Sequence, residues 1–146
     1  MKWVTRARPK TDRIACPWLI RRFIDPDAAI LYVPTDQVLS AAAAKGARSF
    51  DASGAEYTHR DGKCSFEVLI EDFGLGGDPA LARLAKIVHG ADFPAEMDAT
   101  RESAGLWAIS QGFTDLGMDD AEVLARASFL YDSLYAHMKR LEIEPA

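Results

Sequence analysis

The residues in this chain best suited to chemistry are two of its three histidines and the carboxylates beside them. His59 lies in a short segment that Glu56 opens and Glu67 closes, and Asp92 follows shortly after His89. Imidazole and carboxylate groups gathered from separate segments are typical ligands of zinc, manganese and iron. The sequence therefore predicts one mononuclear metal site built from these two segments.

The expected ligands of this site are His59, Glu67 and His89, with Asp92 as the fourth metal-binding residue. Glu67 is expected at the start of a helix, a firm position from which a carboxylate can reach back toward His59. Two histidines and one carboxylate leave coordination positions open, which suits a catalytic ion more than a closed structural one. The predicted cofactor is a divalent metal ion, Zn, Mn or Fe.

Two other carboxylates, Glu56 and Glu71, are alternatives for the fourth position or for orienting a ligating histidine. Residues three apart on a strand face opposite sides, so Glu56 and His59 share a metal only if the strand bends. A second interpretation gives both histidines structural roles. A histidine near a hairpin can bond to backbone, and one at the end of a helix is favoured by the helix dipole.

Catalytic roles are expected for Arg13, Arg60 and a carboxylate. The forked donors of Arg13 and Arg60 suit an anionic or polar group of a substrate. Glu56 or Asp92 is the expected general base. Asp12 and Arg13 come at the start of a predicted helix, where both side chains can point into a cleft.

Composition narrows the classes of protein that this chain can represent. The 146 residues fit one domain, 1–146, and the net charge of −5 argues against nucleic-acid binding through overall charge. Cys16 and Cys64 do not make a disulfide framework, and we expect both to pack in the core. No apolar run suits a signal peptide or a membrane span, so a cytoplasmic protein is expected.

Local patterns predict the elements that must hold these residues. Asp61 and Gly62 predict a type I′ turn between the two strands of a hairpin. Gly90 and Gly112 are expected to end helices. Pro17 leaves two choices, a helix from Thr11 or Asp12 or one that begins near Cys16. The expected strands are 2–6, 29–33, 48–51, 55–60 and 63–66, and the expected helices are 12–23, 37–45, 66–73, 79–89, 94–110 and 120–141.

This order of elements predicts an α/β (α+β) fold. A small mixed sheet in the N-terminal half is covered by several helices, and the C-terminal half is all helical. The last predicted helix is long and amphipathic, with apolar residues at the 3.6-residue period. It could pack on the core or on a second copy of the chain, which leaves a homo-oligomer open.

Several motifs of the chain resemble the C-terminal domain family of the chromate resistance protein ChrB. They are the segments 12–26, 54–60, 64–67 and 87–92, and the resemblance extends over nearly the whole chain. In that family the domain often follows an N-terminal regulatory part and is linked to chromate resistance and sensing. Without such a part, a role as a DNA-binding repressor is not expected. The motifs coincide with the segments that carry His59, Glu67 and His89.

The expected function is that of a metal-dependent small-molecule enzyme of lyase or hydrolase type. No glycine-rich phosphate loop or dinucleotide fingerprint points to another cofactor. The expected partner is a small-molecule substrate or an oxyanion, with no nucleic acid and no membrane. The alternative is a non-enzymatic sensor of metal or chromate, or an accessory protein of chromate resistance. A module without any small-molecule site is a third interpretation.

Overall fold

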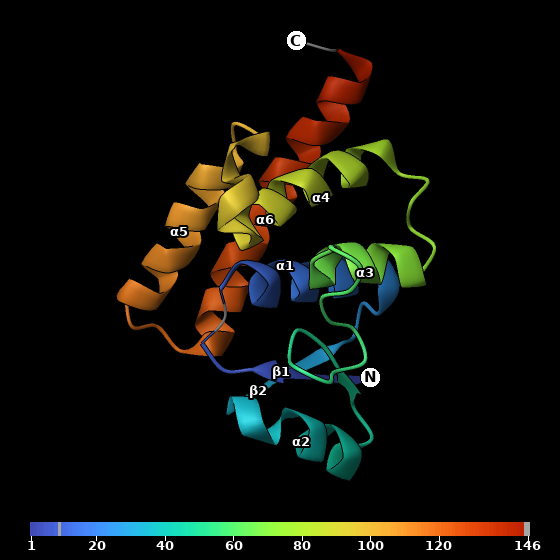
Figure 1. Ribbon diagram of the computed structural model, residues 1–146, viewed down its shortest axis with the longest axis vertical. Coiled ribbons are helices and arrows are strands. Elements are labelled where there is room, and N and C mark those ends of the chain that lie inside the picture. The colour runs from blue at the N-terminus through green and yellow to red at the C-terminus, as the bar shows by residue number, and fades with distance from the viewer. Residues whose placement is uncertain (9, 145–146) are drawn as a thin grey trace.

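The computed structural model describes residues 1–8 and 10–144 and is shown in Figure 1. Its strands and helices alternate at first and become all helical after the third strand. The elements are β1 (Lys2–Arg6), α1 (Thr11–Leu19), the π-helix η1 (Ile20–Ile24), β2 (Ala29–Val33), the 3-10 helix η2 (Thr35–Gln37), α2 (Val38–Lys45), β3 (Arg48–Ser49), α3 (Ser65–Asp72), α4 (Pro79–Asp92), the 3-10 helix η3 (Pro94–Ala99), α5 (Ser103–Asp115) and α6 (Asp120–Ile143). The expected fold class is confirmed.

The sheet has the strand order β2-β1-β3, and both of its ladders are parallel rather than mixed as the sequence suggested. Trp3 and Ile30, which are opposite in register, contribute to the main core, whereas Val4 and Leu31 contribute to a smaller core with α2. Figure 1 shows α2 on one side of the sheet and α1 with the remaining helices on the other. A parallel sheet needs this cover on both faces.

Helix α1 runs through Pro17 instead of beginning beside it. The helix starts at Thr11 and continues as η1 to Ile24, so the predicted start is confirmed and the alternative start near Cys16 is wrong. Proline has no N–H for the carbonyl four residues earlier, which belongs to Arg13. The hydroxyl of Tyr32 donates to that carbonyl oxygen instead, at 3.2 Å, and so ties α1 to β2.

The predicted turn at Asp61 and Gly62 is present, but the hairpin around it is not. Both residues have positive φ, 53° and 76°, as a type I′ turn requires, and Arg60 and Lys63 exchange two backbone hydrogen bonds. The backbone N–H of Tyr57 donates to Ser49 O, and its carbonyl oxygen accepts from Asp51 N, so this segment lies beside β3. Helix α3 then begins at residue 65. The prediction of strands over 55–60 and 63–66 is therefore wrong.

Two glycines expected to end helices lie inside them. Helix α4 passes through Gly90 to Asp92, and α5 passes through Gly112. A Cβ on Gly90 would lie 2.4 Å from Ser103 Oγ, so close packing of α4 on α5 explains this glycine. The single helix expected over 94–110 is two, η3 and α5, because Thr100 is extended and its hydroxyl accepts from Ser103 N.

Helix α1 lies at the centre of the main core. Trp18 stacks on Phe66 of α3 with ring centroids 6.5 Å apart and contacts Tyr131 of α6 at 6.0 Å. Its indole N–H donates to Asp132 at 2.7 Å. These contacts join the two halves of the chain and fix α1, which carries Asp12 and Arg13, against α3 and α6. Among the described residues, no helix combines the length and the apolar character that a membrane crossing requires.

Candidate metal centres

The structure places the predicted ligands in two groups rather than one. Asp12, His59 and Asp92 form the first group, called here the His59 centre. The second group, the His89 centre, consists of Cys64, Glu67 and His89. Within each group the ligand atoms lie within 4.8 Å of one another. The single set of His59, Glu67, His89 and Asp92 is therefore divided, because α4 directs His89 and Asp92 to different neighbours.

The His59 centre brings carboxylates from α1, from α4 and from the loop after β3 to one imidazole nitrogen. His59 Nε2 lies 2.9 Å from Asp92 Oδ2, 3.3 Å from Asp12 Oδ2 and 3.6 Å from Asp51 Oδ1. Asp12 and Asp51 are almost completely buried, whereas the His59 side chain is 44% exposed. One imidazole N–H can satisfy only one of these acceptors at a time.

Two arginines partly balance this negative charge. Arg6 donates to the backbone oxygen of Asp51 at 2.7 Å and to its Oδ2 at 3.1 Å. Arg13 Nε lies 3.4 Å from the same Oδ2, and another guanidinium nitrogen of Arg13 donates to Ala7 O. Both arginines therefore contact Asp51, whereas Asp12 lies against His59 and Ser65 N, and Asp92 lies against His59.

The carboxylates of the His59 centre are poorly placed for negative charge without a cation. Burial raises the pKa of Asp92 to about 7, and the nearby charges of Asp12 and Asp51 add to the rise. Burial also raises the pKa of Asp12. The hydrogen bond to Asp12, with help from the other two carboxylates, raises the pKa of His59 to about 9. Perturbed pKa values of this kind are typical of clusters of interacting ionisable groups at functional sites.

Unpartnered oxygen atoms test whether this donor set fits a metal ion. Within residues 1–8 and 10–144, Asp12 Oδ1 and Asp92 Oδ2 are buried and have no hydrogen-bond partner. The contact of Asp92 Oδ2 with His59 is close but lacks hydrogen-bond geometry. Buried carboxylate oxygens are usually paired, and a cation is a partner that would satisfy both. The donor set therefore fits a divalent ion that prefers oxygen and imidazole.

A cleft of about 150 Å³ opens beside the His59 centre. Its polar wall includes Arg6, Lys10 and Arg13 in addition to the acidic residues. Trp107 of α5, whose side chain is partly exposed, lies on its apolar side. The expectation that Asp12 and Arg13 would both point into a cleft is confirmed.

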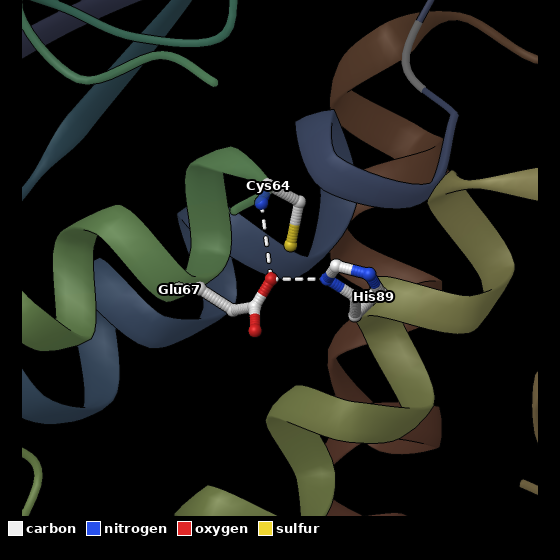
Figure 2. A group of neighbouring side chains, drawn as sticks. All are labelled: Cys64, Glu67 and His89. Carbon is white, nitrogen blue, oxygen red and sulfur yellow. Dashed lines mark hydrogen bonds and ion pairs between the residues drawn. The ribbon is translucent and has the colours of Figure 1, made fainter. Parts of the chain in front are cut away.

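The His89 centre has a different chemical character. Figure 2 shows the Cys64 sulfur, the Glu67 carboxylate and the His89 ring directed toward one another from α3 and α4. Glu67 Oε1 accepts from Cys64 N at 3.0 Å and lies 2.5 Å from His89 Nδ1. His89 Nε2 lies 2.8 Å from Glu96 of η3. Burial lowers the pKa of His89, but the bonds to these two glutamates outweigh it and raise the value.

Helix α4 and the first turn of α3 connect the two centres. His89 and Asp92 are one turn apart on α4, and the Phe93 ring lies 4.5 Å from the His89 ring and 5.2 Å from the His59 ring. Cys64 belongs to the His89 centre, while Ser65 N donates to Asp12 at 2.8 Å. The two centres are therefore neighbours that share their supporting elements.

Three residues proposed from the sequence lie in surface ion pairs. Glu56 pairs with Arg48, Arg60 pairs with Asp72, and Glu71 pairs with Lys63. None of the three belongs to either group of candidate ligands in the described part of the chain. Arg13, by contrast, lies at the His59 centre.

Neither Asp51 nor the role of Asp12 as a candidate ligand was identified from the sequence. Asp12 is 47 residues from His59 along the chain, and although Asp51 is only eight residues away, nothing in the local pattern of either residue suggests a ligand. Asp51 has a φ of 48°, which is uncommon for a residue other than glycine, but sequence alone does not show this. For Asp12, only its position in a family-like motif beside Arg13 could have raised attention.

The fold and the two centres define a small α/β domain with two neighbouring clusters of candidate metal ligands. The family model described as "ChrB, C-terminal domain" matches residues 3–138, and the chain belongs to this family. It is 38% identical over 136 residues to Protein ChrB of Cupriavidus metallidurans. The alignment covers 93% of this chain but 40% of that protein. No solved structure is significantly similar to the chain.

Proposed function

We propose that the domain binds a divalent metal ion at the His59 centre and uses it in hydrolase or lyase chemistry on a small molecule. The observation that supports this most is the meeting of three aspartates at His59 Nε2, with two buried carboxylate oxygens lacking a donor among the described residues. A buried carboxylate oxygen without a donor is costly, and a bound metal ion would offset that cost.

Asp12, His59 and Asp92 would hold the metal, and each is supported by its own element. Asp12 is fixed by Ser65 N, and Asp51 accepts from Ser65 Oγ, so one residue of α3 orients two carboxylates. Arg6 and Arg13 hold Asp51 beside the centre. A metal ion bound here would act as a Lewis acid and lower the pKa of a bound water.

The cleft suggests a small substrate with an anionic or polar group. Lys10 is exposed at its wall, so its ammonium is free to meet an anion, while Arg6 and Arg13 add positive potential. Trp107 offers an apolar surface for the rest of the molecule. The volume of about 150 Å³ fits a compact molecule rather than a polymer.

Metal analysis tests the binding step of this proposal. Chelator-treated protein is titrated with Mn²⁺, Fe²⁺ or Zn²⁺ by calorimetry, and the metal content of the purified protein is measured by elemental analysis. His59→Ala and Asp92→Asn should each remove one bound equivalent. Glu56→Gln, which changes a surface carboxylate outside the centre, should keep it. Equal metal content in all four proteins would contradict the proposal.

Turnover tests the catalytic step. The metal-loaded protein is assayed against small esters, lactones and phosphoesters that carry an anionic group. Turnover should disappear on chelation, return with the metal, and be absent in Asp92→Asn. If hydrolysis or elimination proceeds equally well in the chelated protein, the metal has no catalytic role.

A second candidate is a metal-sensing or chromate-sensing accessory role in chromate resistance. The family membership supports it, as do the cationic residues at the cleft, which could meet an oxyanion. Chromate added to the metal-free protein should then release heat and raise the unfolding temperature. The absence of both effects would count against chromate as the ligand. A cytoplasmic location remains part of either proposal, and the free thiols of Cys16 and Cys64 are consistent with a reducing compartment.

A further inference from the structure

The side chains of the His89 centre are presented by rigid parts of two helices. Cys64 is the N-cap residue of α3, and Glu67 occupies the third position of its first turn. Their reciprocal contact, with Cys64 N donating to Glu67 Oε1, fixes the thiol and the carboxylate together. His89 comes from the last turn of α4, within 4.8 Å of both. Ligands held in this way need little rearrangement to bind an ion.

Each ring nitrogen of His89 faces a carboxylate, Nε2 that of Glu96 and Nδ1 that of Glu67. Glu96 accepts from Nε2, which assigns the proton of a neutral imidazole to that nitrogen. The lone pair of Nδ1 is then only 2.5 Å from Glu67 Oε1, and two acceptors at this distance repel each other. A second proton fits between two atoms at this distance and makes the contact a short hydrogen bond, whereas a metal ion in its place would move the two atoms apart to roughly 3 Å, the spacing of two ligands on one ion. A carboxylate behind the distal nitrogen is the usual partner of a metal-ligating histidine.

Cys64 distinguishes these two outcomes. Its side chain is fully buried and forms no disulfide, yet it points toward the Glu67 and His89 ligand atoms. A proton shared by His89 and Glu67 would make no use of a thiol. A thiolate beside an imidazole and a carboxylate is a donor set that zinc favours.

We propose that Cys64, Glu67 and His89 form a second metal site, selective for a thiophilic divalent cation such as Zn²⁺. Binding forms the S–Zn and N–Zn bonds and releases two protons to solvent, the thiol proton of Cys64 and the proton between His89 Nδ1 and Glu67. Glu96 acts as a positioning residue through His89. A cleft of about 190 Å³, lined by Lys86, Ala99 and Thr100 together with Glu67 and His89, leaves room for a water or another ligand as the fourth donor.

This site does not depend on the proposed function of the His59 centre. The two sites use different side chains, and their ligand sets have different preferences. Oxygen-rich sites suit Mn²⁺ and similar ions, whereas a thiolate selects zinc and its spectroscopic substitute Co²⁺. Variants of one centre can therefore be tested without removing a ligand of the other.

Cobalt titration of the chelator-treated full chain tests the proposal. Co²⁺ should produce a sulfur-to-metal charge-transfer band, and one equivalent of Zn²⁺ should remove it. Cys64→Ser should abolish the band, whereas Cys16→Ala, which changes the other buried cysteine, and His59→Ala should keep it. A wild-type protein without the band, or a band that persists in Cys64→Ser, would overturn the proposal.

Glu96→Gln keeps the proposal testable if Cys64→Ser fails to fold. Glu96 is exposed, so this change should leave the circular dichroism and unfolding of the metal-free protein unaltered. It should weaken Zn²⁺ binding by about 10- to 100-fold, as loss of a carboxylate behind a ligating histidine does. The charge-transfer band of the Co²⁺ form should keep its shape at saturation. Unchanged Zn²⁺ affinity would contradict a metal at His89.

Discussion

The His59 centre and the His89 centre share helix α4 but differ in the side chains that they bring together. The first gathers aspartates around one half-exposed imidazole and leaves buried oxygens without donors among the described residues. In the second, both nitrogens of His89 contact a glutamate and a thiol lies alongside. The first offers oxygen and imidazole donors, and the second adds a thiol to them.

This difference shows that the ligand atoms, rather than the presence of a histidine, define the two sites. Two carboxylates with an imidazole favour a harder ion, and a thiolate favours a softer one. Because His89 and Asp92 lie one turn apart on α4, any movement of that helix affects both centres at once. The comparison can therefore be tested by changes that affect one centre, both or neither.

The largest expected effect is the loss of metal-dependent stability in single-histidine variants. A ligand at about 100 times its dissociation constant stabilises the folded state by about 2.7 kcal/mol. The stabilisation by Mn²⁺ should disappear in His59→Ala and remain in His89→Ala. Zn²⁺ can bind at both centres, so each variant should lose the stabilisation that comes from one of the two bound Zn²⁺ ions and keep the other. Thermal unfolding with and without metal measures this, and identical losses in both variants would mean a single shared site.

Gly90→Ala should weaken both centres together. The new Cβ would lie 2.4 Å from Ser103 Oγ and 3.1 Å from the backbone oxygen of Glu96, so α4 must shift. We expect a loss of about 1 to 3 kcal/mol in the free energy of unfolding, and weaker binding at both metal sites. Urea unfolding and metal titration measure the two effects.

Gly112→Ala is the matched control for that change. Gly112 also lies inside a helix, but a Cβ there would meet nothing within 4 Å. This substitution should stabilise the protein by about 0.5 to 1 kcal/mol and leave both sites intact. If the two variants unfold at the same urea concentration, the close contact of Gly90 with α5 has no energetic importance.

Asp92→Asn should affect the His59 centre in opposite ways with and without metal. In the metal-free protein it removes one of three crowded carboxylates, and we expect stabilisation on the order of 1 kcal/mol above neutral pH. The sign follows from the raised pKa, because ionised Asp92 costs stability as pH rises through about 7. With metal present, the variant should gain no stability. Glu67→Gln, the corresponding change at the His89 centre, should not stabilise the metal-free protein.

The smallest effect is expected for Asp132→Asn, outside both centres. The hydrogen bond from Arg22 lowers the pKa of Asp132, helped by the one from Trp18. Its contribution to stability is therefore present above about pH 3.8 and is lost as pH falls through the lower folded value. The pair is partly exposed, so the loss at neutral pH should be about 0.2 to 1 kcal/mol. Unfolding at pH 7 and pH 3 measures it, and metal binding should not change.

Much of the fold was predictable because its signals are local. Gly46 adopts the left-handed conformation that ends α2, Asp78 and Asp119 cap α4 and α6, and Asp61 with Gly62 forms the expected turn. These positions depend on a few neighbouring residues. The errors at Gly90 and over 94–110 arose where α4 packs on α5, a contact that no local pattern contains.

The sequence by itself determined which side chains are available for chemistry, namely two histidines near carboxylates, in motifs of the ChrB C-terminal domain family. Only the tertiary structure decided which of them meet. The packing of α1, α3 and α4 brings Asp12 and Asp51 to His59, and it turns His89 toward Cys64 and Glu67. The physical reason is that coordination geometry depends on distances of a few ångströms, which long-range packing sets and local sequence does not.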